Sequence, residues 1–325
     1  MDFAPHPYSL RQLQYAVAVA ELLSFRRAAE RCHVSQPSLS AQLAQLEASL
    51  GVQLFERGGR KVLVTRAGAD VIDRARRLLV AADDLLSESR RASDPLSGSV
   101  RIGVIPTIAP YLLPTMAPRL RSKFKKLTVL WREDKTAELM VALERGTLDA
   151  ALLARESELG DVEMELVGED PFVLACAAKH PLGCEKSAVT SAELRGADVM
   201  LLDDGHCFRD QALEVCARLR LHEGEFRATS LATLVQMVAA GMGVTLLPGL
   251  AVATETRHAA LSIRPIASPR AHRTLVLVWR KRAALSEAMR AIAAEIRKGF
   301  LSESPESLSG SQRPTRRGRP SGDTD

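Results

Sequence analysis

Two cysteines, Cys207 and Cys216, have the residue type and spacing that could support redox chemistry. Residues 203–205, two aspartates and a glycine, are typical of a loop, and the run Phe208–Leu219 holds good helix formers without glycine or proline. We therefore predict that a helix begins at Cys207 and that this thiol lies at the helix N-terminus.

A cysteine at a helix N-terminus lies where its thiolate form is favoured, because unpaired backbone amides and the helix dipole stabilise negative charge. Arg209 and a protonated His206 would act in the same direction. The thiolate is the form that attacks an oxidant. Cys207 is therefore the first candidate for a reactive residue.

The nine-residue spacing between Cys207 and Cys216 keeps the two thiols apart if the helix is continuous. Nine residues of α-helix span about 13.5 Å along the axis and place the two ends on opposite faces. A disulfide requires Cα atoms within roughly 7 Å. Pairing would therefore require the helix to unwind, and oxidation would act as a conformational switch. The alternative is that both cysteines are small buried apolar residues.

The composition is that of an ordinary soluble globular protein, long enough for two or three domains. Of its 325 residues, 46% are hydrophobic and 26% are charged. No apolar run approaches a membrane span and the N-terminus lacks a signal-peptide pattern, so we expect a cytoplasmic protein. Five cysteines without framework spacing fit a reducing compartment, and the net charge of +5 permits nucleic-acid binding.

The N-terminal segment has the order of a helix-turn-helix. Apolar residues recur at helical spacing over Leu10–Leu23, a short helix follows over Phe25–Cys32, and a turn at His33–Val34 leads into a third helix capped by Ser35. One face of the third helix is a leucine stripe. The other carries Pro37 and alanines flanked by serines and glutamines that can bond base edges or phosphates. A plain three-helix bundle is the alternative.

A basic hairpin is predicted after the third helix. Residues 51–56 lead into 58–65, which begins with two glycines and two basic residues. A hairpin at this place is typical of a winged helix-turn-helix domain, and its basic side chains can reach the DNA backbone or the minor groove. The wing residues predicted to do so are Arg57, Arg60 and Lys61.

A long helix is predicted from Thr65 to about Arg91. Its apolar residues repeat in steps of four and three, as in a coiled-coil seam, at Val71, Ala75, Leu78, Ala82 and Leu85. The seam predicts dimerisation, which suits binding to two DNA half-sites. The alternative is a helix packed on its own domain. Residues 93–98 break the helix and are predicted to form a hinge.

Residues 98–300 alternate strand-like and helix-like segments and are predicted to form an α/β region. The apolar strands are VRIGVI, LTVLW, DAALLA, FVLACAA, VMLLD, GVTLLP and TLVLVW, and the helices cover 111–126, 136–145, 207–219, 230–241 and 284–299. We expect two lobes, one of residues 98–169 and 270–300 and the other of residues 170–269. Ligands in such folds bind in the cleft.

The N-terminal residues 10–66, with FRRAAERCHVSQPSLSAQLAQLEASLGVQLFER and VTRAG, closely resemble the DNA-binding domain of LysR-type transcriptional regulators. The resemblance implies a winged helix-turn-helix domain over 8–66, a linker (dimerisation) helix over 67–92, and a two-lobed α/β effector domain over 98–300 that is similar to a periplasmic binding protein. It also implies a recognition helix that contacts DNA through Ser35, Gln36, Pro37, Ser38, Ser40 and Gln42.

The segments LLDDGHCFRDQALEVC and FRATSLATLVQMVAAGMGVTLLPGLAV, with RIGVIPTIAPYLLP and RTLVLVWR, are similar to the peroxide-sensing members of that family. The resemblance implies that peroxide oxidises Cys207 to a sulfenic acid, which Cys216 resolves as a reversible disulfide. It places the peroxide pocket at Thr107, Thr136, His206 and Arg273. The alternatives are capping by the threonines, a structural ion pair of the arginine and a loop hydrogen bond of the histidine.

Other segments are assigned no chemistry. Cys176, His180 and Cys184 are spaced by four, but Pro181 and Gly183 interrupt the segment, so no metal site is predicted. Cys32 is predicted to be a core residue. The tail over 302–325, rich in serine, proline, glycine and arginine, is predicted to be disordered.

The resemblance thus implies a DNA-binding activator of oxidative-stress genes, not an enzyme, with no cofactor. Its implied partners are double-stranded operator DNA, further copies in a homotetramer, RNA polymerase and a thiol reductant of glutaredoxin or thioredoxin type, without a membrane. Two alternatives stay open. A LysR-type regulator with a small anionic metabolite in its cleft would still respond after Cys207→Ser, and a thiol peroxidase would turn over peroxide in the steady state.

Overall fold

The computed structural model describes residues 6–56, 62–91, 94–155, 159–185, 187–205, 207–219, 221–257, 259–267, 271–281, 283 and 285–303. The chain divides into two compact units. The first contains residues 1–95 together with 144–147, and the second contains the remainder.

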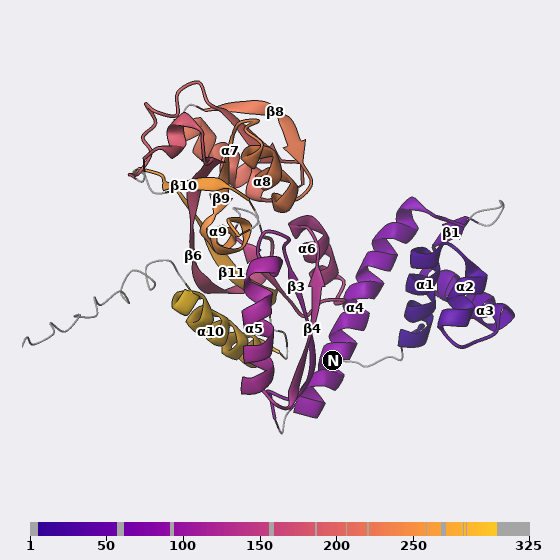
Figure 1. Ribbon diagram of the computed structural model, residues 1–325. Coiled ribbons are helices and arrows are strands. Elements are labelled where there is room, and N and C mark those ends of the chain that lie inside the picture. The colour runs from indigo at the N-terminus through magenta and orange to yellow at the C-terminus, as the bar shows by residue number, and fades with distance from the viewer. Residues whose placement is uncertain are drawn as a thin grey trace, which may run out of the picture. The chain divides into compact units, whose positions relative to one another are not determined.

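Helices and a short hairpin form the first unit, and serine caps explain where three of the helices begin. The elements are α1 (Leu10–Leu22), α2 (Phe25–Arg31), α3 (Gln36–Leu50), β1 (Phe55–Glu56), β2 (Leu63–Val64) and α4 (Arg66–Arg91) (Figure 1). Ser9, Ser24 and Ser35 each accept a hydrogen bond from a backbone amide of the first turn. The leucine stripe of α3 lies in the core that these helices share with the start of α4.

The second unit is built on a mixed sheet with the strand order β4-β3-β5-β11-β6-β9-β7-β8, and β10 pairs with β6. Its strands are β3 (Gly98–Val104), β4 (Leu127–Glu133), β5 (Ala150–Ala154), β6 (Val162–Ala177), β7 (Asp198–Leu202), β8 (His222–Ala228), β9 (Val244–Pro248), β10 (Leu261–Pro265) and β11 (His272–Arg280). Its helices are α5 (Ala109–Lys123), α6 (Thr136–Glu144), η1 (Pro181–Gly183), α7 (Cys207–Leu219), α8 (Leu231–Ala239), α9 (Gly249–Glu255) and α10 (Ser286–Glu303).

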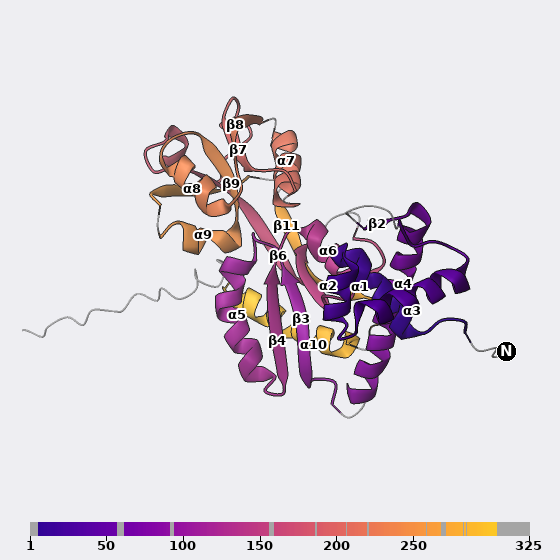
Figure 2. The ribbon, with the colours of Figure 1, turned by 90° about the vertical axis from the view of Figure 1, so that its right-hand side faces the viewer.

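The long strand β6 joins two lobes of this unit, as both ribbon views show (Figures 1 and 2). Up to Pro171 it pairs with β11, and from Phe172 it pairs with β9, with β10 beside it. The first lobe holds β3–β5, β11, α5, α6 and α10, and the second holds β7–β10 and α7–α9, each with its own apolar core. The predicted fold class, a winged helix-turn-helix with a two-lobed α/β domain, is confirmed.

The elements that sequence patterns missed are polar or short. The first half of β6 alternates glutamates with apolar residues, and β8 reads HEGEFRA, so neither has the apolar run used to recognise strands. Helix α9 has only seven residues and directly follows β9. Helix α7, which carries the two cysteines, begins and ends at the residues predicted for it.

Candidate functional site

Cys207 is the first residue of α7 and is 8% exposed. It follows β7 through a turn in which Gly205 takes a left-handed conformation, with φ at 84°. Although α7 belongs to the second lobe, the Cys207 side chain packs with the apolar core of the first lobe. The thiol is thus held where the two lobes meet.

A small cavity of about 10 Å³ adjoins this thiol, which is close to the volume that one water molecule needs. The Oγ1 atom of Thr136 is buried and has no hydrogen-bond partner among the described residues. The hydrogen of this hydroxyl can therefore be donated to a small polar molecule that enters the cavity. The cavity is lined by Ile105, Pro106, Thr107, Lys135, Thr136, Gly205, Cys207 and Phe208.

Arg273 fixes one wall of this region through a buried ion pair. Its guanidinium lies 2.8 Å from a carboxylate oxygen of Asp170, and both side chains are almost completely buried. Nη1 donates to Thr107 Oγ1 at 2.7 Å and Nη2 donates to the Thr107 carbonyl at 3.0 Å. Because the Thr107 hydroxyl oxygen accepts from Arg273, its own hydrogen remains to donate elsewhere. The guanidinium also lies 5.5 Å from the centre of the Phe208 ring.

Arg209, expected to favour the Cys207 thiolate, is engaged with partners of its own. Its Nε lies 2.9 Å from Asp204, its Nη2 lies 2.8 Å from Glu223, and Nη1 donates to the Leu202 carbonyl at 3.2 Å. The same two carboxylates also pair with Arg227, so two cations and two anions form one network, which reduces the effect of Arg209 on the Cys207 thiol. The side chain instead ties the start of α7 to β7 and β8.

Cys216 belongs to a different core from Cys207. It is 4% exposed and packs with the apolar residues of the second lobe. Burial, together with the negative charge of Glu223, raises the pKa of this thiol to about 11. All five cysteines are thiols in this structure, and the unbroken helix α7 separates the two candidates. His206 lies outside the described residues.

The raised pKa of Cys216 predicts a loss of stability in alkali. The unfolded thiol ionises near its ordinary value of 9.0, whereas the folded one ionises near 11. Between these values only the unfolded state releases the proton, so the free energy of unfolding of the reduced chain should fall by at most about 2–3 kcal/mol. Urea unfolding from pH 8 to pH 11 with reductant would measure this. Cys216→Ala is the reference, and an identical pH slope in both proteins would contradict the prediction.

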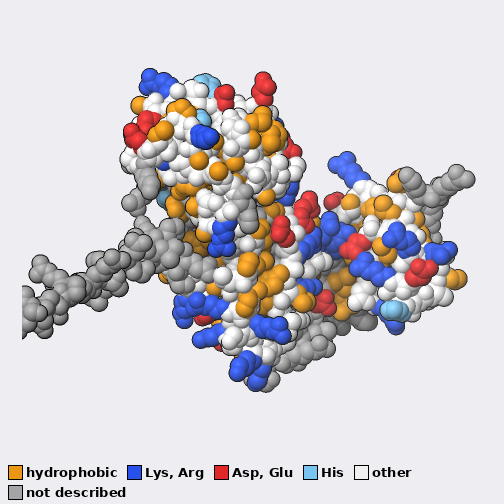
Figure 3. Space-filling view, in the orientation of Figure 1, with side chains coloured by type: hydrophobic (Ala, Val, Ile, Leu, Met, Phe, Trp, Pro, Cys, Tyr) orange, Lys and Arg blue, Asp and Glu red, His pale blue; other side chains and the backbone are white. Residues whose placement is uncertain are grey.

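The candidate DNA interface lies on α3, opposite its buried leucines. Ser35, Gln36, Pro37 and Ser38 are exposed, while Ser40 and Gln42 are partly exposed. The predicted wing residues Arg57, Arg60 and Lys61 lie outside the described residues. The space-filling view shows Lys and Arg side chains, with some acidic ones between them, on the visible face of this unit (Figure 3). On α2, Arg27 is exposed, whereas its neighbour Arg26 pairs with Glu30.

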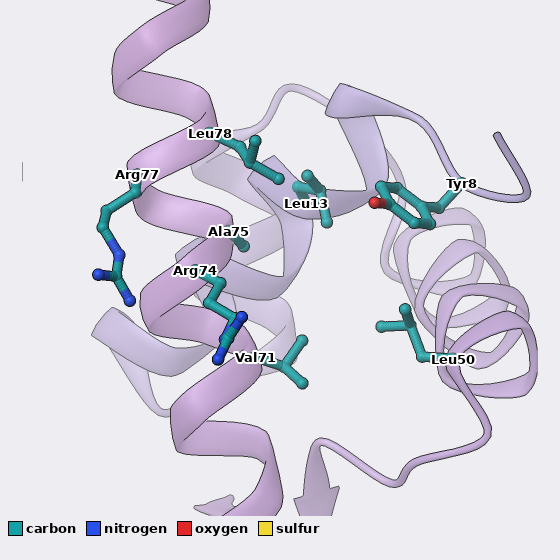
Figure 4. Close-up of a pocket in the computed structure, with 8 residues that line it drawn as sticks. All are labelled: Tyr8, Leu13, Leu50, Val71, Arg74, Ala75, Arg77 and Leu78. Atoms are coloured by element: carbon teal, nitrogen blue, oxygen red, sulfur yellow. The ribbon is translucent and has the colours of Figure 1, made fainter. Parts of the chain in front are cut away.

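The predicted seam of α4 splits into two parts. Val71 and Ala75 pack on the core of their own unit, Ala82 is partly buried, and Leu78 and Leu85 are 49% and 68% exposed. The first half therefore packs on its own domain, and dimerisation through the second half stays a prediction. A groove of about 640 Å³ lies beside the first half. Its lining combines Tyr8 and apolar side chains of α1, α3 and α4 with Arg74 and Arg77 (Figure 4).

Two family models match the chain. Residues 10–69 match the bacterial regulatory helix-turn-helix protein of the lysR family, and residues 93–301 match the LysR substrate binding domain. The DNA-binding transcriptional dual regulator OxyR of Escherichia coli K12 is 43% identical over 292 residues, 89% of this chain and 95% of that protein. The chain belongs to the OxyR group of the LysR family. It is therefore a DNA-binding transcription regulator and not an enzyme.

Further relatives and solved structures agree with membership of the LysR family. A probable hydrogen peroxide-inducible genes activator of Mycobacterium avium is 41% identical over 87% of this chain and 92% of its own length. A full-length cysteine variant of Pseudomonas aeruginosa OxyR has a TM-score of 0.72 at 33% identity, covering 89% of this chain and 97% of its own. A peroxide-bound cysteine variant of Corynebacterium glutamicum OxyR has a TM-score of 0.63 at 34% identity, covering 96% and 100%.

None of the helices in the described ranges is long and apolar enough to cross a membrane.

Proposed function

We propose that this regulator senses hydrogen peroxide through Cys207 and activates oxidative-stress genes. The observation that carries the proposal is the cavity beside Cys207, in which the buried Thr136 hydroxyl has no hydrogen-bond partner among the residues that the structure describes. A volume of about 10 Å³ suits an oxidant of two oxygen atoms far better than a metabolite. The relatives are named for hydrogen peroxide, a molecule of only two heavy atoms.

The chemistry needs two thiols and one peroxide. The Cys207 thiolate attacks one peroxide oxygen, the O–O bond breaks, and hydroxide leaves with a proton as water, so that the cysteine becomes a sulfenic acid. The Cys216 sulfur then attacks the Cys207 sulfur, the S–O bond breaks, and a second water leaves. The hydroxyls of Thr107 and Thr136, with Arg273 and His206, are the groups we assign to holding the peroxide.

The disulfide step requires a conformational change. Nine residues of continuous helix place Cys207 and Cys216 about 13.5 Å apart along α7, and they pack in separate cores. At least part of α7 must therefore unwind, which releases Cys207 from the first lobe. We propose that this change alters the arrangement of a homotetramer on its operator DNA, and that RNA polymerase is activated as a result. A reductant of glutaredoxin or thioredoxin type would then reduce the disulfide back to two thiols in the cytoplasm.

Two surfaces suit contacts between copies of this chain. One is α4, with its exposed Leu78 and Leu85 and the adjacent groove of Figure 4. The other is the open edge of β4, where Leu130 is 51% exposed beside a groove of about 920 Å³ lined by residues that include Ala117 and Trp131. An exposed edge strand and an apolar helix face both favour association.

The α4 contact can be tested by a charge at its apolar surface. Leu85→Glu should lower the dimer affinity at least about tenfold, because a carboxylate would be buried between copies. Sedimentation velocity and binding to operator DNA would measure it. Leu301→Glu, which changes a similarly exposed leucine on α10, is the matched control. Unchanged association of the Leu85 variant would show that α4 is not the interface.

The sensing proposal itself is tested by mapping thiols after brief exposure of the purified chain to near-stoichiometric hydrogen peroxide. Free thiols are alkylated before digestion and peptides are identified by mass spectrometry. We expect a peptide pair joining Cys207 to Cys216 that dithiothreitol separates. Cys207 recovered as a free thiol in a protein that still binds DNA would refute the proposal.

The cavity makes a separate prediction for Thr136. Thr136→Val removes a buried hydroxyl that bonds to none of the described residues, so the stability of the reduced chain should be unchanged or up to about 1 kcal/mol higher. The rate of Cys207 oxidation should nevertheless fall at least about tenfold, since a donor to the peroxide is lost. Quenched-flow alkylation would give the rate. Thr115→Val, which removes a hydroxyl bonded to the Leu112 carbonyl in α5, serves as the control and should leave the rate unchanged.

A further inference from the structure

Lys135 is a cation at the Cys207 cavity that the sequence patterns did not indicate. It precedes Thr136, the first residue of α6, and lines the same cavity as Cys207 and Gly205. Its Nζ donates to the Asp204 carbonyl at 3.0 Å. This bond joins the first lobe to the turn that precedes α7.

The two arginines near the cavity are engaged with carboxylates. All three guanidinium nitrogens of Arg273 are bonded to Asp170 or Thr107. The guanidinium of Arg209 is bonded to Asp204, Glu223 and the Leu202 carbonyl. Nearby carboxylates therefore neutralise the charge of each guanidinium, so neither arginine places a net positive charge beside the thiol.

Lys135, in contrast, keeps an uncompensated charge. Its Nζ forms no ion pair within the described part of the chain, and its one hydrogen bond goes to a neutral carbonyl. The neighbouring carboxylate of Asp134 accepts from the Lys135 backbone amide and pairs with Arg132 at 2.7 Å. The ammonium has three hydrogens, so two remain for groups in the cavity.

We propose that Lys135 is the cation that stabilises the Cys207 thiolate, and the hydroxide that leaves when the O–O bond breaks. The inference rests on the proposed peroxide chemistry and adds a residue to it. In the same position the ammonium holds the turn at Asp204 and Gly205 against α6, and a Cβ at Gly205 would lie 3.2 Å from Nζ. Lys135 thus links the charge on the thiol to the position of the turn that carries it.

Two substitutions separate charge from position. Lys135→Gln retains a donor for the Asp204 carbonyl but removes the charge, and Lys135→Arg retains the charge. The full-length reduced chain is used throughout, with circular dichroism to confirm folding. Two rates are measured on the Cys207 peptide by mass spectrometry: alkylation by monobromobimane across pH, which needs no peroxide, and oxidation by hydrogen peroxide at pH 7.

Lys135→Gln should raise the midpoint of the alkylation pH profile by about one pH unit and slow oxidation roughly tenfold, whereas Lys135→Arg should stay close to wild type. An unmoved midpoint in Lys135→Gln would overturn the assignment, even if oxidation slowed, because the effect would then be one of position alone. If wild-type Cys207 failed to react with peroxide, the proposed function would fail, and the alkylation profile would still decide the role of Lys135.

Discussion

Replacement of Cys207 by serine is expected to abolish the response to peroxide. A serine hydroxyl does not form the nucleophilic anion at neutral pH that a thiol forms, so the first oxidation should slow by at least about a hundredfold. Disulfide formation should then be undetectable at near-stoichiometric peroxide, and binding to operator DNA should stay in its reduced pattern. Mass spectrometry of the thiols and DNase footprinting with and without peroxide would measure both effects.

The other cysteines provide matched controls for that result. Cys216→Ser should leave the oxidation of Cys207 intact, but the reaction should stop at the sulfenic acid. A dimedone adduct on Cys207 would reveal this acid. Cys184→Ser removes an exposed thiol, and Cys176→Ser removes a buried thiol in β6; neither residue lines the cavity. Both should respond as wild type does. A normal footprint response in Cys207→Ser would instead favour a small-molecule effector.

The parts of the site that the sequence predicted are those set by local signals. Cys207 begins α7 because a loop of aspartates and a glycine ends there and helix formers follow. Ser35 caps α3, and the leucine stripe of α3 is buried as its spacing requires. Such features depend on residues within one or two turns of each other, so a single sequence contains them.

Contacts between residues that are far apart in the sequence could not be predicted from such local signals. Arg209 follows Cys207 by two residues, yet its guanidinium turns to Asp204 and Glu223, because β8 brings Glu223 beside the start of α7. Asp170 stands 103 residues before Arg273. Lys135 approaches the Asp204 carbonyl only because the two lobes fold together. Which cation faces the thiol is therefore decided by the tertiary structure and not by proximity in the sequence.

The largest change in stability is expected from Asp170→Asn. The carboxylate and the Arg273 guanidinium are 1% and 0% exposed, and the second carboxylate oxygen accepts from the Leu250 amide at 3.0 Å. Removing the negative charge leaves a buried guanidinium without compensation, which typically costs about 3–5 kcal/mol of unfolding free energy. Urea unfolding of the reduced chain at pH 7 would measure the loss.

Glu163→Gln is the matched control, because it breaks a more exposed ion pair with Arg290. Such pairs contribute about 0–1 kcal/mol, so this variant should unfold nearly as wild type does.

Removal of the positive charge of Arg273 as well should restore part of the lost unfolding free energy. In Asp170→Asn the cost comes from the isolated guanidinium and not from the missing attraction, so Arg273→Met in the same chain should restore stability relative to Asp170→Asn alone. The double variant would still lack the bonds to Thr107, and its peroxide reaction should remain slow. The free energy of unfolding would then recover while the rate of the peroxide reaction would not. This result would mean that the ion pair holds β6, β11 and the loop at Thr107 together, and that the peroxide reaction requires the Arg273 side chain. If the double variant were no more stable than Asp170→Asn alone, the cost would come from the missing attraction and not from the isolated guanidinium, and the prediction would be wrong.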